Sequence, residues 1–519
     1  MNIILILSIT LLITAAADLF VTLRRDLMML QQNSYRRDRY VNWINKSGET
    51  TTFRRIFAMI ALLLPLAFRN AEILTYPFAA IVCVWNTLDL ATAKYKKPLV
   101  LTSRASRLLI TSLLISAIII CIIYFVSDNI NATVWSLLGG IIISPIILLA
   151  AHLVLQPVEN AINRHYYNDA VARLNSMKDL IVIGITGSYG KTSTKHYLNR
   201  ILSEYFDVTM TPGSFNTPLG VIRTIREYLK PYNQVFIVEM GAKQIGDIKE
   251  ICDIVHPQIG IITAVGEQHL ESFKTIQNVQ RTKFELADAL PSDGYAVVNN
   301  DFEYIKNREI TNVKSVRYSV RDNAQSGYQA TNIKYNSHGA TFTLVTPDKE
   351  EIDFTTPLLG ECNISNLIGA IAVAIHLGEP IEKIKYAVSH IEQVEHRLSK
   401  KTTAGGITIM EDAFNSNPDG SKMALDVLSQ MNGGKRIVIT PGMIELGEKQ
   451  YELNKTFGEH IAESVDIAIV VGKYNRDAIT EGINSKGFDK KNLYIVDSFA
   501  EAQATLSPII TTGDTVLYE

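Results

Sequence analysis

The sequence is short of cysteine and of any excess of charge. Four cysteines (Cys83, Cys121, Cys252, Cys362) occur among 519 residues without a CxxC pair, which argues against a disulfide framework or a zinc knuckle. The 50 basic and 52 acidic residues nearly cancel, so the composition predicts no nucleic-acid partner. Neither an internal repeat nor a low-complexity tract occurs, and an apolar content of 47% excludes a disordered chain. At roughly 150 residues per domain, the length allows about three or four folded units.

Long apolar runs are concentrated in the first 158 residues. Mean hydropathy is +0.11 although 20% of the residues are charged, because a membrane region is averaged with a soluble part of ordinary composition. A spanning helix needs about 20 mostly apolar residues, and the sequence predicts about five transmembrane helices in 1–158. The run 56–68 is short and contains Pro65, so a re-entrant or interfacial helix is the alternative there. The five runs are residues 1–17, 56–68, 73–88, 108–127 and 129–158.

Basic loops predict the orientation of this region. Residues 24–55 hold eight Lys/Arg, and residues 93–107 hold five with no acid, so both loops are expected in the cytoplasm. Five spans then place everything after about residue 158 in the cytoplasm, which predicts a multi-pass protein of the inner (cytoplasmic) membrane. No basic stretch precedes the first run, which favours an anchor over a cleaved signal peptide. Asp18 lies near the basic end of that run, and we interpret it as an interfacial group, with a functional intramembrane carboxylate as the alternative.

From about residue 177 strands alternate with helices. Continuous β-branched runs at 179–186, 234–239, 259–265 and 295–299 predict a mostly parallel sheet with helices on both faces. The alternating texture of 310–358 predicts an antiparallel sub-sheet, and 399–406 is interpreted as a linker. A second strand–helix series follows it. The predicted domains are a membrane region over 1–158, a central α/β domain over 177–398 and a smaller Rossmann-like domain over 406–519.

A glycine-rich loop gives the sharpest chemical signal. Residues 184–193 (GITGSYGKTS) join a predicted strand to a predicted helix, where backbone N–H groups and the helix N-terminus favour a phosphate chain. Lys191 would reach the β- and γ-phosphates, and the Thr192 hydroxyl would ligate Mg²⁺. The pattern GxxxxGK[ST] fails at Ile185, and a tight glycine turn before a helix is the alternative. The predicted ATP-binding residues of this loop are Thr186, Gly187, Ser188, Gly190, Lys191, Thr192 and Ser193.

The variant pattern TGxxGK[ST] resembles that of the Mur ligases, the ATP-dependent amide ligases of cell-wall precursor synthesis, and the resemblance extends over residues 180–519. Six later segments, in order, are similar to segments of that family, with Cys362 in place of a usual histidine. The last two are most similar to those of the members that add D-alanyl-D-alanine. The resemblance implies a P-loop-type ATPase domain, a Rossmann-like domain, and an ADP-forming reaction through an acyl phosphate. The six are residues 238–242, 266–273, 281–285, 360–366, 411–418 and 441–447.

The same resemblance implies roles for individual residues. Glu239 and His269 would ligate Mg²⁺ with Thr192, and Lys283 would be carbamylated and help to hold a second Mg²⁺. Several of these residues also have a structural alternative. These are a helix N-cap acid for Glu239, a surface histidine for His269, a solvated helix lysine for Lys283, polar caps for Asn363 and Asn366, and loop turns for Asn216, Asn415 and Asn417. The implied catalytic group is Lys191, His269, Lys283 and Arg397; Asn363 and Asn366 lie near adenine, Arg397 near the γ-phosphate, Asp412 at the ribose, Asn216 and Thr217 in a substrate loop, and Asn415 and Asn417 near the incoming amine.

The chain departs from the family at its N-terminus, where membrane helices stand in the place of a soluble domain that holds a UDP-sugar. The departure predicts that the ligase does not hold a UDP-linked acceptor in the way usual for the family, and that it extends a lipid-linked or polymeric substrate held at the inner leaflet. The predicted partners are a carboxylate acceptor, which is a lipid-linked or UDP-linked muramyl peptide, membrane lipids, and an amino acid or dipeptide amine such as D-Ala-D-Ala. A poly-γ-glutamate-type synthase and a non-catalytic nucleotide-binding envelope scaffold are the alternatives. A scaffold needs none of five residues whose joint retention therefore disfavours it, namely Lys191, Glu239, His269, Lys283 and Arg397.

Overall fold

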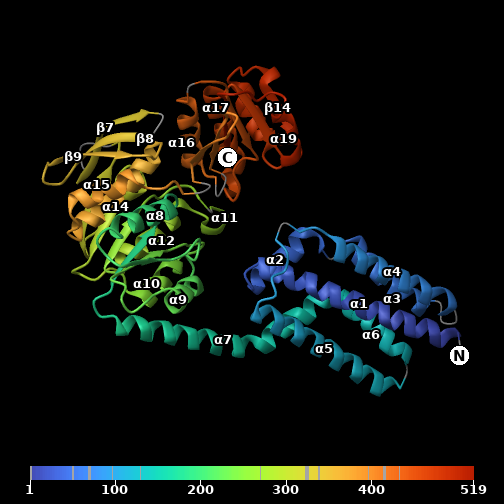
Figure 1. Ribbon diagram of the computed structural model, residues 1–519. Helices are drawn as coiled ribbons and strands as arrows, with labels where there is room; N and C mark the ends of the chain where they lie inside the picture. The colour runs from blue at the N-terminus through green and yellow to red at the C-terminus, as the bar shows by residue number, and fades with distance from the viewer. Residues whose placement is uncertain are drawn as a thin grey trace. The chain divides into compact units, whose positions relative to one another are not determined.

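The protein consists of a helical N-terminal unit, Met1–His165, and a C-terminal unit built on two sheets, Tyr166–Glu519 (Figure 1). Each unit is described by itself. The computed structural model describes residues 3–49, 52–67, 72–95, 97–128, 130–268, 270–321, 327–336, 339–394, 397–412, 416–431 and 433–519.

The N-terminal unit is a bundle in which α6 packs against α1, α3 and α5, and α1 packs against α4. In the described residues, four helices are long and apolar enough to cross a membrane, namely 3–32, 73–92, 103–127 and 144–176. Its helices are α1 (Ile3–Gln32), α2 (Arg37–Ser47), α3 (Phe53–Ala67), α4 (Glu72–Thr92), α5 (Ser103–Ser127), α6 (Ile130–Ile142) and α7 (Ser144–Ser176), the last of which continues into the second unit.

Two of the predicted apolar runs differ in the structure. The run 129–158, expected as one span, is divided between α6 and α7 at Ile143. Pro145 lies in the first turn of α7, where the missing proline N–H breaks no helix hydrogen bond, so the proline favours a new helix start there. Residues 56–67 of the run 56–68 lie in α3, which has 15 residues and is shorter than the roughly 20 residues that a span requires; residue 68 lies outside the described residues.

The first sheet of the C-terminal unit has nine strands in the order β2-β3-β1-β4-β5-β6-β7-β8-β9. Pairs from β2 to β7 are parallel, and β7-β8-β9 are antiparallel. The predicted antiparallel part of 310–358 therefore begins at β7, and the expectation was wrong for β6, which pairs in parallel with β5. The strands are β1 (Ile181–Thr186), β2 (Val208–Met210), β3 (Val235–Glu239), β4 (Ile259–Ile262), β5 (Tyr295–Asn299), β6 (Lys314–Ser319), β7 (Tyr328–Asn336), β8 (Gly339–Val345) and β9 (Glu351–Thr356).

Helices cover both faces of the parallel part of this sheet. Because side chains alternate along a strand, Ile183 and Ile185 of β1 pack with α8, α14 and α15, while Val182 packs with α9, α10 and α12. Gly184 leaves room between the layers, since a Cβ there would lie 2.6 Å from Leu286 Cδ1. The helices are α8 (Lys191–Leu202), α9 (Pro218–Glu227), α10 (Asp247–Val255), α11 (Leu270–Phe273), α12 (Ile276–Asp288), α13 (Glu303–Lys306), α14 (Glu361–His376) and α15 (Ile381–Ser389).

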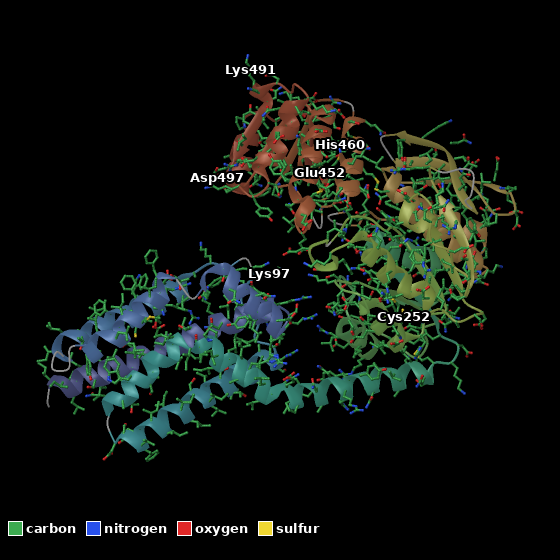
Figure 2. The ribbon with its side chains drawn as sticks, turned by 180° about the vertical axis from the view of Figure 1, so that it is seen from behind. Lys97, Cys252, Glu452, His460, Lys491 and Asp497 are labelled. Carbon is green, nitrogen blue, oxygen red and sulfur yellow. The ribbon has the colours of Figure 1, made fainter. Side chains whose placement is uncertain are left out.

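The second sheet has the order β10-β11-β15-β12-β13-β14 and is parallel except for the β10–β11 pair. The segment 399–406, predicted as a linker, is instead the edge strand β10 followed by a turn with Gly406 at φ +74°. Figure 2 shows Lys491 and Asp497 at the surface of this domain and Cys252 within the central one. The elements are β10 (Ser399–Thr402), β11 (Thr408–Glu411), β12 (Arg436–Thr440), β13 (Ile467–Val471), β14 (Leu493–Val496), β15 (Thr515–Tyr518), α16 (Pro418–Ser429), α17 (Gln450–Ser464), α18 (Arg476–Ser485), α19 (Phe499–Leu506), and the 3-10 helices η2 (Gly447–Lys449) and η3 (Lys490–Asn492).

The predicted fold class is thus confirmed: apolar helices precede two α/β domains with mostly parallel sheets.

Candidate functional site

The glycine-rich loop lies between β1 and α8, at the carboxyl edge of the parallel sheet, where open α/β sheets bind ligands. Gly187 has φ +152° and Gly190 has φ +77°, and the second value favours glycine. Space also requires glycine at both positions. A Cβ on Gly187 would lie 2.1 Å from Thr263 Oγ1, and one on Gly190 would lie 2.2 Å from Asn366 Oδ1.

Lys191, the first residue of α8, folds back over this loop. Its Nζ donates hydrogen bonds to the carbonyl oxygens of Gly187 at 2.6 Å and Ser188 at 3.1 Å. Burial lowers the pKa of Lys191 to about 8, although Glu239 acts in the opposite direction. The ammonium group therefore lies against the backbone of the loop, where it would attract an anionic phosphate.

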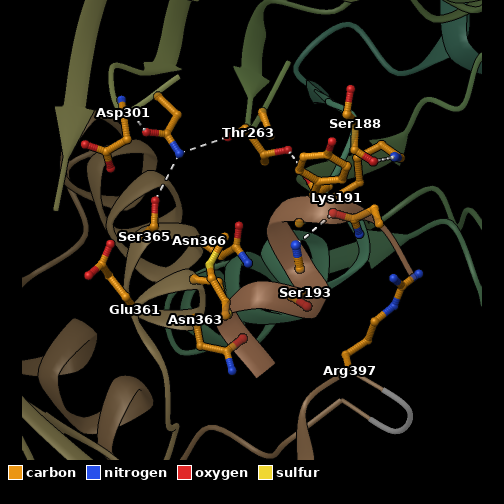
Figure 3. A pocket seen from close by; sticks show the side chains of 18 of the residues that line it. Ser188, Lys191, Ser193, Thr263, Asp301, Glu361, Asn363, Ser365, Asn366 and Arg397 are labelled. Atoms are coloured by element: carbon orange, nitrogen blue, oxygen red, sulfur yellow. Dashed lines mark hydrogen bonds between the residues drawn. The ribbon is translucent and has the colours of Figure 1, made fainter. Parts of the chain in front are cut away.

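A pocket opens beside the loop and receives residues from both α/β domains (Figure 3). Thr186 and Gly187 belong to the same loop without lining the pocket, whereas most of the other predicted nucleotide residues do line it. Those are Ser188, Gly190, Lys191, Thr192, Ser193, Asn363, Asn366, Arg397 and Asp412, together with the predicted amine-side residue Asn417.

The two asparagines of α14 differ in their contacts. Asn363 Oδ1 accepts from the Tyr197 hydroxyl at 2.8 Å, and its Nδ2 donates to the Leu359 carbonyl at 2.8 Å. The first bond joins α14 to α8, and the second joins α14 to the segment just before it. Asn366 lies one turn further, against Gly190, and faces the phosphate loop.

Asn299, at the end of β5, is a pocket residue that the sequence reasoning missed. Its Nδ2 donates to the Thr263 carbonyl at 2.9 Å and to Ser365 Oγ at 3.0 Å (Figure 3). These bonds fix the ends of β4 and β5 to α14. Because Asn299 is a polar residue at the carboxyl end of a buried strand, the reasoning that selected Glu239 would also have found it.

Arg397, at the end of the central domain, and Asp412, which follows β11, bring side chains of opposite charge to the pocket. Burial raises the pKa of Asp412 to about 7, although Arg397 and the backbone N–H of Leu398, which donates to Asp412 Oδ1 at 3.1 Å, oppose this rise. Burial also lowers the pKa of Arg397, against the attraction of Asp412 and Glu239. The Asp412 carboxyl therefore changes its charge near neutral pH.

Glu239 ends β3 and is 2% exposed. Burial alone would raise the pKa of Glu239, but the ammonium groups of Lys195 and Lys191 outweigh it and hold this pKa below its usual range. Asn216 Nδ2 donates to Glu239 Oε1 at 3.0 Å, so the predicted substrate loop lies beside the predicted metal ligand. Thr217 caps α9 by accepting from the Gly220 N–H at 3.3 Å.

Lys283 of α12 is 3% exposed. Burial holds the pKa of Lys283 well below its usual range, and the positive charge of Lys191 lowers it further. Burial therefore favours the neutral amine form of this side chain. Its Nζ lies 5.9 Å from the centroid of the Phe273 ring.

The remaining predicted residues are less informative. His269 and Asn415 lie outside the described residues. Asn417 caps α16 by accepting from the Gly420 N–H at 2.9 Å. Throughout the described ranges, no group of three or more His, Cys, Asp or Glu side chains could hold a metal ion.

Two family models match the C-terminal unit. Residues 185–374 match the Mur ligase middle domain, and residues 396–518 match the domain described as "Mur ligase, glutamate ligase domain". The N-terminal helical region lies outside both ranges. UDP-N-acetylmuramoyl-tripeptide--D-alanyl-D-alanine ligase of Escherichia coli (strain K12) is 30% identical over 335 residues, which cover 64% of this chain and 74% of that protein.

Solved structures are similar over the same part of the chain. MurF from Acinetobacter baumannii is 28% identical with a TM-score of 0.62, and the match covers 68% of this chain and 76% of that one. MurF ligase from Thermotoga maritima, determined in complex with ADP, has a TM-score of 0.62 at 22% identity and covers 68% and 79%, a similarity that concerns the fold.

Proposed function

This chain belongs to the Mur ligase family, and we propose that it is a membrane-anchored ligase that joins a muramyl-peptide carboxylate to a dipeptide amine such as D-alanyl-D-alanine. Relatives that carry the D-alanyl-D-alanine ligase name support this substrate pair. The observation that carries the proposal is the phosphate loop, whose Lys191 shares one pocket with Arg397, at the end of the central domain, and with Asp412 of the second α/β domain. An ATP-dependent, ADP-forming reaction is the activity of the family.

The proposed reaction has two steps. An acceptor carboxylate oxygen forms a bond to the γ-phosphorus of ATP as the bond to ADP breaks, which gives an acyl phosphate. The amine nitrogen then attacks the acyl carbon, and phosphate leaves as the amine gives up a proton. Because the reacting carboxylate and phosphate are both anions, neutralisation of charge and positioning supply most of the catalysis. Lys191 and Arg397 would provide the positive charge around the γ-phosphate.

The residues present fit a magnesium site. Thr192 offers a hydroxyl at the phosphate loop, and Glu239 keeps its carboxylate charged at neutral pH. Mg²⁺ prefers such oxygen ligands together with substrate phosphates. We propose Thr192 and Glu239 as ligands, with His269 as a third and Lys283 as a fourth when carbamylated. When bound, the ion would neutralise phosphate charge.

The burial of Lys283 supports its proposed carbamylation. A neutral amine can attack CO₂, with loss of one proton to water, whereas an ammonium group cannot. Because burial lowers the pKa of Lys283, it favours the form that reacts. We propose that the resulting carbamate gives the site the negative charge that a lysine lacks.

The N-terminal unit supports a membrane location. We propose that it lies in the cytoplasmic membrane as a multi-pass region over 1–158, that the ligase domains are cytoplasmic, and that the acceptor is held at the inner leaflet as a lipid-linked or UDP-linked muramyl peptide. The central domain then covers 177–398. The C-terminal domain begins at Ser399 because β10 pairs with β11.

The proposal is tested with full-length protein in membranes. ATP, D-Ala-D-Ala and either UDP-linked or lipid-linked muramyl tripeptide are supplied, and ADP and the ligated product are measured, the latter by mass spectrometry. We expect a product heavier than the acceptor by one dipeptide minus water, lost with Lys191→Ala and kept with the control Lys383→Ala, an exposed lysine of the same domain. Extension of only an amino-acid polymer, or no product with any acceptor, would overturn the proposal.

A further inference from the structure

A second lysine of α8 is buried in the core. Lys195 lies one turn after Lys191 and is 0% exposed. Lysine is almost never fully buried unless an opposite charge or several acceptors surround it. Its position on the inner face of α8, with Leu198 and Ile201, would ordinarily hold an aliphatic residue.

Lys195 contacts two segments that are far from α8 in the sequence. Its Nζ lies 2.9 Å from Glu239 Oε2, at the end of β3. The same Nζ donates to the carbonyl oxygen of Gly213 at 2.6 Å. One ammonium group thus joins the helix that follows the phosphate loop, the proposed metal carboxylate, and the segment 211–217.

Further hydrogen bonds fasten the segment 211–217 to β3 and to the residues just after it. Glu239 N–H donates to Thr211 Oγ1 at 3.1 Å, and Asn216 Nδ2 donates to Glu239 Oε1 at 3.0 Å. The Gly241 N–H donates to the Asn216 carbonyl at 2.8 Å. A Cβ on Gly241 would lie 2.8 Å from the Asn216 side chain, so the segment lies closely against the end of β3.

An ion pair is not the most stabilising way to fill this space. Buried ion pairs are often no more stabilising than apolar residues of the same volume, because both charges lose their hydration. Lys195 and Glu239 are both nearly inaccessible to water, so the desolvation cost is large. Unlike an apolar contact, the ion pair fixes the direction of the Glu239 carboxylate. Lys195 also donates a hydrogen bond to the loop 211–217.

We propose that Lys195 is a positioning residue for the ligase reaction. It holds the Glu239 carboxylate and the loop 211–217 at a fixed distance from Lys191 and Thr192, which are one turn earlier on the same rigid helix. The assignment of 211–217 as the acceptor loop rests on the proposed function. The Lys195 ammonium group thereby joins the loop 211–217, which would bind the acceptor carboxylate, to helix α8, which would bind the ATP phosphates at its N-terminus.

The test compares wild-type full-length protein with Lys195→Met, which nearly keeps the length of the side chain and removes its charge. Hydrogen exchange is followed over residues 208–217 and at the Glu239 and Gly241 amides, which are bonded to this loop. We expect at least tenfold faster exchange there. We also expect at least a tenfold rise in the KM for the acceptor, with a change of less than threefold in the Kd for a fluorescent ADP measured without magnesium.

Lys383→Met is the matched control. Lys383 Nζ also donates to a backbone carbonyl, that of Glu204 at 2.8 Å, but it is exposed and far along the chain from the loop. We expect the control to leave loop exchange, acceptor KM and ADP affinity unchanged. Unchanged loop exchange in Lys195→Met, or an equal loss of ADP and acceptor binding, would overturn the proposal.

A second variant keeps the test decisive when the unpaired Glu239 destabilises the fold. Lys195→Met/Glu239→Gln removes both charges, and we expect its melting temperature to recover while exchange of 208–217 stays fast. Recovery of slow exchange in this double variant would show that Lys195 acts only on stability. The exchange measurement needs no substrate, so it decides the role of Lys195 even where the acceptor assay refutes the ligase proposal.

Discussion

Replacement of Gly190 by alanine is the sharpest perturbation of the phosphate loop. At φ +77° an alanine costs about 1–2 kcal/mol more than glycine. In addition, its Cβ would lie 2.2 Å from Asn366 Oδ1, whereas ordinary contacts begin near 3.4 Å. Asn366 or the start of α8 must therefore move by about 1 Å. We expect ADP to bind at least tenfold more weakly to Gly190→Ala, a loss of about 1.4 kcal/mol.

Gly378 provides a matched control for the backbone strain. It has the same φ, +77°, and among the described residues no atom lies within 4 Å of the place that an alanine Cβ would take. Gly378→Ala is expected to lower the melting temperature as Gly190→Ala does, and to leave ADP affinity unchanged. Both variants are measured as full-length protein in detergent, by thermal unfolding and by titration with a fluorescent ADP.

The contact with Asn366 can be tested separately from the strain. In the double variant Gly190→Ala/Asn366→Ala the colliding amide is absent, so we expect part of the lost ADP affinity to return relative to Gly190→Ala. Wild-type ADP affinity in Gly190→Ala would refute the reasoning, because the loop would then tolerate a side chain where the structure has no space for one.

Three further outcomes are expected. Wild-type protein depleted of CO₂ should lose ligase activity and regain it with bicarbonate, whereas Lys283→Gln should stay inactive in both conditions, because only a neutral lysine forms the carbamate. Burial raises the pKa of Glu379 to about 7, so its contribution to stability is complete below pH 4.5 and declines as pH rises through 7. A rise from 4.5 to 7 corresponds to about 3 kcal/mol, and the loss of melting temperature between pH 5 and pH 8 should therefore shrink in Glu379→Gln. Burial, with a smaller effect of Asp412, raises the pKa of Cys362 to about 12, so iodoacetamide at pH 8 should label it more slowly than an unperturbed cysteine, as measured by mass spectrometry.

Local sequence patterns were sufficient to predict the parallel strands of the central sheet and its phosphate loop. Continuous β-branched runs mark strands that are buried on both faces, and the parallel strands β1, β3, β4 and β5 all lie in such runs. A glycine-rich loop between a strand and a helix also has few alternative interpretations. Both features depend on residues that are neighbours in the sequence, so they can be predicted without knowledge of the tertiary fold.

Features that depend on distant partners were missed. The polar sequence of β10 (SKKT) resembles a linker, but its pairing with β11 makes it an edge strand, and lysines are common at such edges. Lys195 is the corresponding case within the site, because its partners Glu239 and Gly213 are known only from the fold. A lysine on the buried face of an amphipathic helix was the available signal, and it was not used.

The N-terminal unit contains buried polar contacts that link several of its helices. Asp26 of α1 is 0% exposed, accepts from Ser144 Oγ of α7 at 2.5 Å, and lies 3.4 Å from Arg55 Nη2 of α3. Arg55 Nη1 also donates to the Ile142 carbonyl at the end of α6, at 2.8 Å.

Asp18, two turns before Asp26 on α1, is likewise 0% exposed and accepts from Thr22 Oγ1 at 3.1 Å and from Asn86 of α4. Charged and polar groups inside an apolar bundle are costly and must be paired in a particular geometry. Residues on the outer face of the bundle carry no such constraint, so these pairs define how α1, α3, α4, α6 and α7 pack. The N-terminal unit is therefore a folded domain with a specified interior, and changes at Asp26 or Arg55 should alter its packing.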